Sequence, residues 1–433
     1  MGQELFLILS ILAAYLIIIL FIGSYSYKRS LSTMEDYHMA GREFNTFLLF
    51  TAIFGTNISA VALVGAPGNA YHVGWITWPY FVTSWGWLTP ILFYTVGNRA
   101  WALGKRLGHM TMSDVIGDRW KSKGLSYLIA AISLFYTIPY VMVGAMGGGQ
   151  TLDGVTGGAV PYWLGALIFT LMVCFYVALG GMRGTAWTNA FQTIVFLIGG
   201  VMIFFVVANA LGGPAKITSV IMEKYPELLT REKMPWKVFF SYGFIVSMAV
   251  PMFPQVFIRL LTGKSQGSLK KMSLIYPVAA IIIWFIVAYV GMWGHTAFPN
   301  LAGPDSQQII PLFLREYSSV WMMGILSAAI FAAAMSSMDA QLLTVGTIFV
   351  KDILYRAKSD SQVIEGREVI VSRILIIVLA AIAYILSLLK PMGIIQIVNW
   401  AFAGFAVLMV PMLGALYWRR CTKQAAFVSI ILS

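Results

Sequence analysis

Charged side chains are scarce in this chain of 433 residues, because Asp, Glu, Lys and Arg together make up only 11% of it. A soluble protein of average composition carries about 25% of these residues. Acidic side chains are the scarcer of the two signs, with 17 Asp and Glu against 29 Lys and Arg. This composition excludes an ordinary soluble globular domain.

Cysteine and histidine are also rare, with two and four residues. Cys174 falls inside an apolar run and Cys421 at a helix end, so we expect no disulfide bond between them. The histidines are far apart in the sequence and form no pair with metal-ligand spacing. The sequence also lacks a GxSxG nucleophile motif and a glycine-rich phosphate-binding loop. These absences argue against an enzyme, against a bound cofactor and against transport driven by ATP bound to this chain.

Apolar residues are correspondingly abundant, at 59% of the chain with a mean hydropathy of +0.81. A helix needs about 20 apolar residues to cross the ~30 Å hydrocarbon core of a membrane. The sequence offers about eleven such runs. They lie at 4–27, 45–70, 75–104, 124–149, 159–179, 188–212, 237–261, 272–297, 319–350, 369–389 and 393–418. We therefore expect an all-α polytopic membrane protein.

The basic residues fall mainly on alternate loops between these runs. The positive-inside rule assigns basic loops to the cytoplasm, which places residue 1 outside. The net charge of +12 is then explained by topology and by contact with lipid headgroups, so we expect no binding to nucleic acid. The sequence predicts a multi-pass protein of the cell membrane, within the lipid bilayer, with its N-terminus outside.

Two adjacent hydroxyl groups, those of Ser336 and Ser337, lie within the apolar stretch FAAAMSSMDAQLLTVGTIFVKD. One turn earlier, the carbonyl group of Ala333 can face the same point. Neutral oxygen atoms of this kind are hard ligands, and they suit a small monovalent cation better than a transition metal. We expect sodium.

The segment TAIFGTNISAVALVGAPGNAYHVG, residues 51–74, carries glycine and proline inside a predicted span. A broken membrane helix must direct its freed carbonyl groups, here those of Gly55 and Ile58, to a protein cavity or an ion. Small residues also allow close helix packing, which is the alternative explanation. Together with Ser336 and Ser337, the segment favours an ion site.

Five segments share the order and spacing of a known family: GTNISAVALVGAPG, GGMRGTAWTNAFQ, PQVFIRLLTGKS, AAAMSSMDAQLLTVGTIFVKD and NWAFAGFAVLMVPMLGALYWRR. The chain resembles the sodium/solute symporter family, nearest its pantothenate and monocarboxylate branch. The resemblance implies a LeuT-type fold of two inverted five-helix repeats with extra peripheral helices. It also implies a sodium site made by the carbonyl groups of Gly55, Ile58 and Ala333 and the hydroxyl groups of Ser336 and Ser337.

Asn189 and Asp339 are two polar positions near the expected sodium site. Asn189 stands where the family usually has Asp, a residue that resembles a stop for sodium on its way to the cytoplasm. Asp339 is an acid three residues beyond Ser336, near the same helix face. A charge inside a membrane is costly and usually functional. Asp339 could tune the ion site, couple protons or be paired for structure.

The resemblance divides the chain into a peripheral helix at 1–30, repeats at 45–212 and 237–418, and an extracellular connection at 213–236. Residues 419–433 begin a further helix that we expect to be truncated. We also expect a short extracellular helix within 298–320.

For the solute, Asn57 is the best polar candidate because it flanks the expected helix break. It could instead only cap the broken backbone. Trp78, Tyr80, Tyr140 and Gln255 are further candidates, although the tryptophan and tyrosine residues could belong to the aromatic belt at the lipid interface.

The predicted function is sodium-coupled secondary active symport, importing a small organic solute, monocarboxylate or pantothenate-like, by alternating access. Two alternatives stay open: a proton-coupled carrier of the same fold, and a sodium symporter for proline, another amino acid or a sugar. The solute, the sodium stoichiometry and the oligomeric state are not determined by the sequence.

Overall fold

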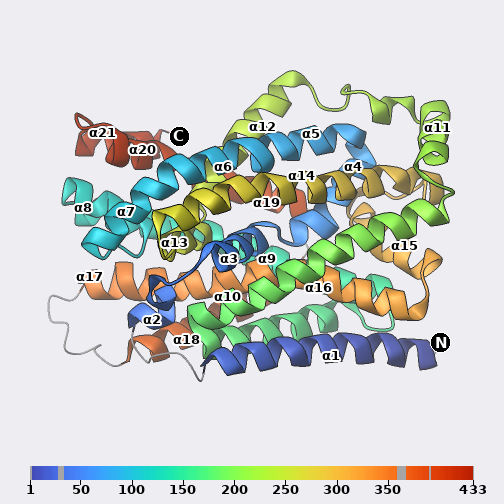
Figure 1. Cartoon of the computed structure of the whole chain (residues 1–433), viewed down its shortest axis with the longest axis horizontal. Helices are drawn as coiled ribbons and strands as arrows, with labels where there is room; N and C mark the ends of the chain where they lie inside the picture. Colours follow the sequence, from blue (N-terminus) through green and yellow to red (C-terminus); the bar gives the residue numbers. More distant parts are fainter. Residues whose placement is uncertain (1, 28–33, 358–366, 390–391, 433) are drawn as a thin grey trace.

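The computed structural model describes residues 2–27, 34–357, 367–389 and 392–432 of the chain, and these residues form helices and no β-strand. Most of the long helices run along one common direction (Figure 1). Long apolar runs in these helices explain the arrangement, because such a helix is stable only when buried in protein or lipid. The predicted all-α membrane fold is confirmed.

Seven helical segments are long and apolar enough to cross a membrane. They are α1 (Gly2–Tyr27), α9 (Lys123–Thr156), α10 (Tyr162–Ala210), α14 (Gln266–Ala297), α16 (Val320–Ile348) with the π-helical η9 (Phe349–Leu354), α18 (Glu368–Leu388), and α19 (Ile394–Ala406) with α20 (Met409–Tyr417).

Two bent pairs add up to two further spans among the described residues. α3 (Thr46–Asn57) meets the helical chain that begins at Val61 at 48°, and α12 (Trp236–Ala249) with η7 (Val250–Met252) meets α13 (Pro254–Leu261) at 51°. Phe253 is extended (φ −60, ψ 122), as expected for a residue before proline. Each pair therefore consists of two half-helices joined at a hinge.

Two glycine residues reverse the chain inside longer helical stretches. Gly74 (φ 80, ψ −154) separates α4 (Ala66–Val73) from the stretch η3 to α7, residues 74–107. Gly181 (φ 55, ψ −152) divides α10, whose 49 residues would otherwise span about 74 Å. Figure 1 shows the two halves of α10 as separate rods. A side chain at Gly74 would collide with the carbonyl oxygen of Leu228, so only glycine is compatible there.

The stretch after Gly74 alternates between helix types. It contains η3 (Gly74–Ile76), α5 (Thr77–Phe81), η4 (Val82–Leu88), α6 (Thr89–Leu92), η5 (Phe93–Gly97) and α7 (Asn98–Leu107), of which η4 and η5 are π-helical.

The connections are also helical. α2 (Met34–Met39) and η1 (Ala40–Arg42) precede α3, η2 (Val61–Gly65) precedes α4, and α8 (Met112–Trp120) precedes α9. α11 (Pro214–Lys224) and η6 (Pro226–Leu229) follow α10, η8 (Gly303–Gln308) and α15 (Ile309–Tyr317) follow α14, and α17 (Tyr355–Ala357) and α21 (Lys423–Ile431) follow η9 and α20. The short helix expected within 298–320 corresponds to α15. The connection at 213–236 holds a helix that the sequence analysis did not predict, although Pro214 is a common first residue of a helix.

α16 is the central helix, with 78% of its most apolar window buried, whereas α1 has 22% buried. α16 packs against α10, α9 and α1, and α1 lies at the edge of the bundle (Figure 1). In sequence terms, α3 to α10 fall within the expected first repeat and α12 to α20 within the second. Residues 28–30 of the expected first segment, and residues 1 and 433 at the chain ends, lie outside the described residues. The repeat boundaries stay a prediction.

Candidate functional site

The centre of the fold is a contact between α3 and α16. The hydroxyl of Ser336 donates a hydrogen bond to the carbonyl oxygen of Gly55 at 2.8 Å and shares that donor with the carbonyl of Ala333 at 3.1 Å. Thr56 returns the contact by donating from its hydroxyl to the carbonyl of Ser336 at 3.4 Å. All four residues are buried. Three of the five predicted sodium ligands therefore lie together.

The backbone leaves helical geometry directly beside this contact. α3 ends at Asn57, and Ile58 is extended (φ −87, ψ 91), so its carbonyl group leaves the helix axis. The hydroxyl of Ser59 accepts a hydrogen bond from the amide of Val61 at 3.1 Å, which supports the start of the next helical segment. The helix break predicted from glycine and proline is thus present at residues 58–60.

Gly55 owes its position to the absence of a side chain. A Cβ atom there would lie 2.5 Å from Oγ1 of Thr193 and 3.6 Å from Cβ of Ser336. Thr193 in turn donates to the carbonyl of Thr51 at 3.0 Å, which holds α10 against α3. The close approach of three helices therefore depends on glycine at this point.

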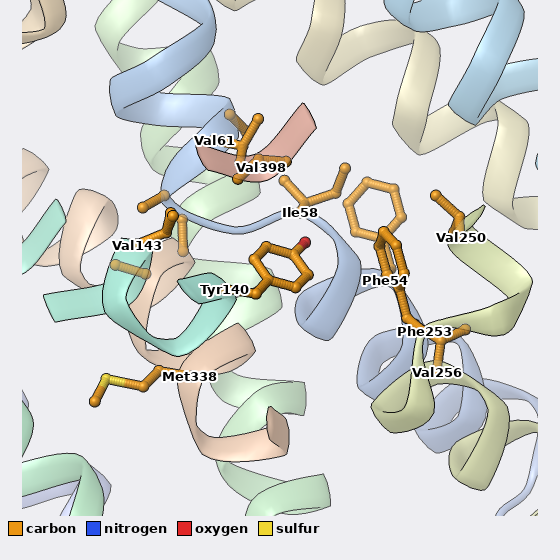
Figure 2. Close-up of a cluster of buried hydrophobic side chains, with 14 of the residues drawn as sticks. Phe54, Ile58, Val61, Tyr140, Val143, Val250, Phe253, Val256, Met338 and Val398 are labelled. Atoms are coloured by element: carbon orange, nitrogen blue, oxygen red, sulfur yellow. The ribbon is translucent and has the colours of Figure 1, made fainter. Parts of the chain in front are cut away.

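Ser337 is adjacent to this contact but is bonded differently. Its hydroxyl donates to the carbonyl of Ala334, one turn back in its own helix, at 3.1 Å. Its side chain is buried and would have to change rotamer to share a cation with Ser336. The side chain of Ile58 belongs to an apolar cluster (Figure 2), so only its backbone carbonyl group is available for the predicted ligand role.

Asn189 and Asp339 also lie in this part of the molecule. Asn189, on α10, donates from Nδ2 to the hydroxyl of Thr56 at 3.3 Å. Asp339, on α16, accepts at Oδ2 from the hydroxyl groups of Tyr176 (3.1 Å) and Thr188 (3.4 Å). Asn189 therefore contacts α3, and Asp339 is part of α16, the helix that α3 contacts.

The amide of Asn57 links three elements at the break. Its Nδ2 atom donates to the hydroxyl of Tyr276 on α14, and its Oδ1 atom accepts from the indole of Trp85 on η4 at 3.1 Å. Both partners are buried. Asn57 therefore holds the side chains of Tyr276 and Trp85 in place. The backbone at the helix break is capped by the hydroxyl of Ser59, and not by Asn57.

Aromatic side chains surround the break on its other side. The ring centroid of Tyr140, on α9, lies 5.3 Å from that of Phe253 and 6.0 Å from that of Phe402. Figure 2 shows its hydroxyl directed toward the chain at Ile58, within a cluster that also contains Phe54. That hydroxyl is buried beside Ser59, and it makes no hydrogen bond of 3.5 Å or less among the described residues. It is a polar atom available to a ligand.

Three further solute candidates are Gln255, Trp78 and Tyr80. Gln255 is fully buried on α13, and neither of its amide atoms has a hydrogen-bond partner in the described part of the chain. Trp78 packs edge to face on Phe285 of α14, and Tyr80 contacts Phe239 of α12.

Several residues at the site were absent from the sequence-based predictions. Thr193 follows Asn189 by four residues, so helical spacing could have indicated it. Thr56 adjoins the predicted break. Tyr276 and Tyr176 lie within long apolar runs, where nothing in the sequence distinguishes them from lipid-facing tyrosine.

The chemistry available here is that of neutral oxygen atoms. In the described residues there is no group of three or more His, Cys, Asp or Glu side chains that could hold a metal ion. Carbonyl and hydroxyl oxygens suit an alkali cation. The arrangement offers binding and release, with no nucleophile and base placed for covalent chemistry.

Comparison with known proteins identifies the family. The family model described as the sodium:solute symporter family matches residues 37–433. A sodium/pantothenate symporter of Escherichia coli is 27% identical over 97% of this chain and 87% of its own. An osmoregulated proline transporter of Bacillus subtilis is 26% identical, over 97% of this chain and 86% of its own.

Solved structures agree on the fold. A sodium-coupled sialic acid symporter, in a substrate-bound outward-open state, aligns over 98% of this chain and 90% of its own with a TM-score of 0.83 at 19% identity. A nucleobase-cation-symport-1 family transporter in a closed conformation aligns over 90% and 82%, with a TM-score of 0.62 at 15% identity. The predicted LeuT-type fold is confirmed. Since the family model covers nearly the whole chain, this protein belongs to the sodium:solute symporter family, a family of multi-pass membrane transporters and not of enzymes.

Proposed function

We propose that this chain imports a small organic solute of the pantothenate or monocarboxylate type together with sodium, across the cell membrane with its N-terminus outside. The observation that carries the proposal is the hydrogen bond from Ser336 to the Gly55 carbonyl, because it joins an unbroken helix to the end of a broken one. Family membership supports sodium as the coupling ion.

The proposed sodium ligands are the carbonyl oxygens of Gly55, Ile58 and Ala333 and the hydroxyl oxygens of Ser336 and Ser337. The hydroxyl of Ser336 now donates hydrogen bonds to the carbonyl groups that would be its fellow ligands. On binding a cation it would turn its lone pairs inward, and α3 would then be held to α16 by coordination. Sodium would thereby stabilise one arrangement of α3 relative to α16, which is what coupling requires.

The proposed solute site is the region around the break in α3, at Asn57, Tyr140 and Gln255. Tyr140 and Gln255 have buried polar atoms without hydrogen-bond partners among the described residues, and such atoms favour a ligand that can bond to them. Asn57 holds Trp85 and Tyr276 in place. Trp78 and Tyr80 remain candidates for the outer wall.

The hinges suggest how the site is exposed to each side in turn. α3 and α13 are half-helices that contact each other and meet their partner segments at 48° and 51°. Movement of α3 and α13 about residues 58–60 and Phe253 would open the ion site without unfolding either helix.

A second candidate solute is proline, because the sequence relatives include proline transporters at 26% identity. Proline is a zwitterion and needs no excess positive charge in its site. We therefore include it beside pantothenate in the test.

The test is uptake of radiolabelled pantothenate and, separately, proline into proteoliposomes that contain the full chain. We expect uptake of one of them to require an inward sodium gradient and to fall to background when choline replaces sodium. Uptake driven equally well by a proton gradient in sodium-free buffer would overturn sodium coupling. Absence of both sodium-dependent binding and uptake for either compound would overturn the solute class.

A further inference from the structure

Two opposite charges, Arg259 and Asp339, lie fully buried inside the helix bundle. Nη2 of Arg259 is 3.9 Å from Oδ1 of Asp339, and both side chains have 0% exposure. Arg259 belongs to α13, one of the hinged half-helices, and Asp339 to the unbroken α16. The cation that faces this acid is thus part of the chain itself.

The surroundings of Asp339 are rich in oxygen. Tyr176 and Thr188 donate to Oδ2 of Asp339, and Thr185 lies 3.5 Å from Nη2 of Arg259. A carboxylate with hydroxyl groups beside it is a ligand set suited to a hard cation.

The guanidinium group of Arg259 makes few hydrogen bonds for a buried arginine. Its Nε and Nη1 atoms have no hydrogen-bond partner among the described residues. A buried arginine normally satisfies its five donors, often by a two-point bond to a carboxylate. The contact with Asp339 is a single longer one. Arg259 therefore neutralises the charge of Asp339, but several of its own hydrogen-bond donors stay without a partner among the described residues.

Asp339 lies three residues beyond Ser336 on the same helix, so the ion pair and the proposed sodium site are neighbours. A second sodium ion beside Asp339 would face the positive guanidinium across a few ångströms of buried protein, where repulsion is strong. The space next to the acid is thereby closed to a free cation as long as Arg259 stays.

We propose that Arg259 acts as a built-in cation, which takes the position beside Asp339 that a second sodium ion would otherwise occupy and so limits binding to one sodium ion per chain. The proposal rests on the sodium site at Ser336. Arg259 is a residue that determines ion stoichiometry, and it does not touch the sodium ion bound at that site.

The experiment counts sodium ions bound to the purified full chain, with radioactive sodium as the only ligand. We expect the wild type to bind one ion per chain at saturation, and Arg259→Gln to bind two. The double variant Arg259→Gln with Asp339→Asn should return to one ion, because the charge that attracts the second is gone. Arg259→Lys keeps the cation and should also bind one.

Arg356→Gln is the matched control. Arg356 also pairs with acids, Asp114 at 2.5 Å and the fully buried Asp352 at 3.6 Å, but Asp352 lies in η9, beyond the end of α16. The control should keep one bound ion.

Each outcome decides the proposal. Two ions bound to the wild type would overturn the role of Arg259 while the Ser336 site stood. No ion bound to the wild type would overturn the proposed sodium site itself. One ion bound to a folded Arg259→Gln, with an unchanged circular dichroism spectrum, would overturn the built-in cation. If Arg259→Gln does not fold, the wild-type count and the count for Arg259→Lys still decide, because two ions in either contradict the proposal.

Discussion

The hydroxyl of Ser336 lies 2.8 Å from the carbonyl oxygen of Gly55, across two helices whose residues are 281 positions apart in the chain. This contact joins the proposed ion site to the helix break, and it determines where variants should have their effect.

Removal of either serine hydroxyl should weaken sodium binding without unfolding the protein. For Ser336→Ala and Ser337→Ala we expect the sodium concentration for half-maximal uptake to rise roughly tenfold, equivalent to about 1.4 kcal/mol. The small side chain still packs, so the thermal midpoint should change little. Ser327→Ala is the control, because Ser327 is fully buried on the same helix and bonds only to the carbonyl of Met323. Unchanged sodium dependence in both variants would contradict the site.

A methyl group at position 55 should disturb the site by steric contact. In Gly55→Ala the new Cβ would lie 2.5 Å from Oγ1 of Thr193, so one helix has to move. We expect at least a tenfold loss of sodium affinity, about 1.4 kcal/mol. Thr193→Ala added to Gly55→Ala should restore part of it. Gly243→Ala, where the nearest atom is 3.8 Å away, should have no effect. An unchanged sodium affinity of Gly55→Ala would contradict the prediction and show that sodium binding does not require the close contact of α3 with α10 and α16.

The contacts of Asn57 predict an effect mainly on the solute. Asn57→Ala leaves the indole of Trp85 and the hydroxyl of Tyr276 without their partner, so the wall of the proposed solute site loosens. We expect the KM for solute to rise by about tenfold and the sodium constant to change by less than about twofold. Parallel uptake titrations measure both. Equal shifts of the two constants would assign Asn57 to the backbone break alone.

Asp339→Asn should lower sodium affinity even though the carboxylate is no proposed ligand. The substitution keeps the size of the side chain and leaves the positive charge of Arg259 without its partner, close to the sodium site. A threefold to tenfold increase in the half-maximal sodium concentration, roughly 0.7–1.4 kcal/mol, is expected. Superimposed sodium titrations of Asp339→Asn and the wild type would make Asp339 a purely structural residue.

The stability of the folded chain should depend on pH through His38. This residue precedes the membrane segment α3; its Nδ1 lies 2.7 Å from the hydroxyl of Thr347 and its Nε2 3.2 Å from that of Ser372. Burial lowers the pKa of His38 from the ordinary 6.5 to about 3. Below pH 6.5 the unfolded chain therefore binds a proton that the folded chain does not, and folding is weakened by about 2 kcal/mol at pH 5.

Thermal unfolding in detergent, followed by tryptophan fluorescence at pH 7.5 and 5.0, measures this effect. The wild type should be less stable at pH 5.0, and His38→Gln should lose part of that difference. His72→Gln, on an exposed side chain, should behave as the wild type. A pH dependence that His38→Gln leaves intact would assign it to other groups.

The fold was largely predictable because lipid imposes long apolar runs: α18 matches the predicted run 369–389 at both ends, whereas α9 continues beyond its run 124–149 and α14 begins before its run 272–297. The helix break was predictable from the glycine and proline of residues 51–74. The reversal at Gly181 agrees with the sequence, because the predicted runs 159–179 and 188–212 leave this glycine between them. The partner of Asp339 was not predictable. Arg259 lies 80 positions earlier in the sequence, and only the packing of α13 on α16 brings the two charges together.

The ion pair of Arg259 and Asp339 also has an electrical consequence. Two opposite charges that move together displace almost no net charge through the membrane field. If the pair stays intact during the cycle, the return of the empty transporter is nearly insensitive to voltage. The bound sodium ion then carries the whole voltage dependence, which amounts to about 2.3 kcal/mol per 100 mV when one charge crosses the full field.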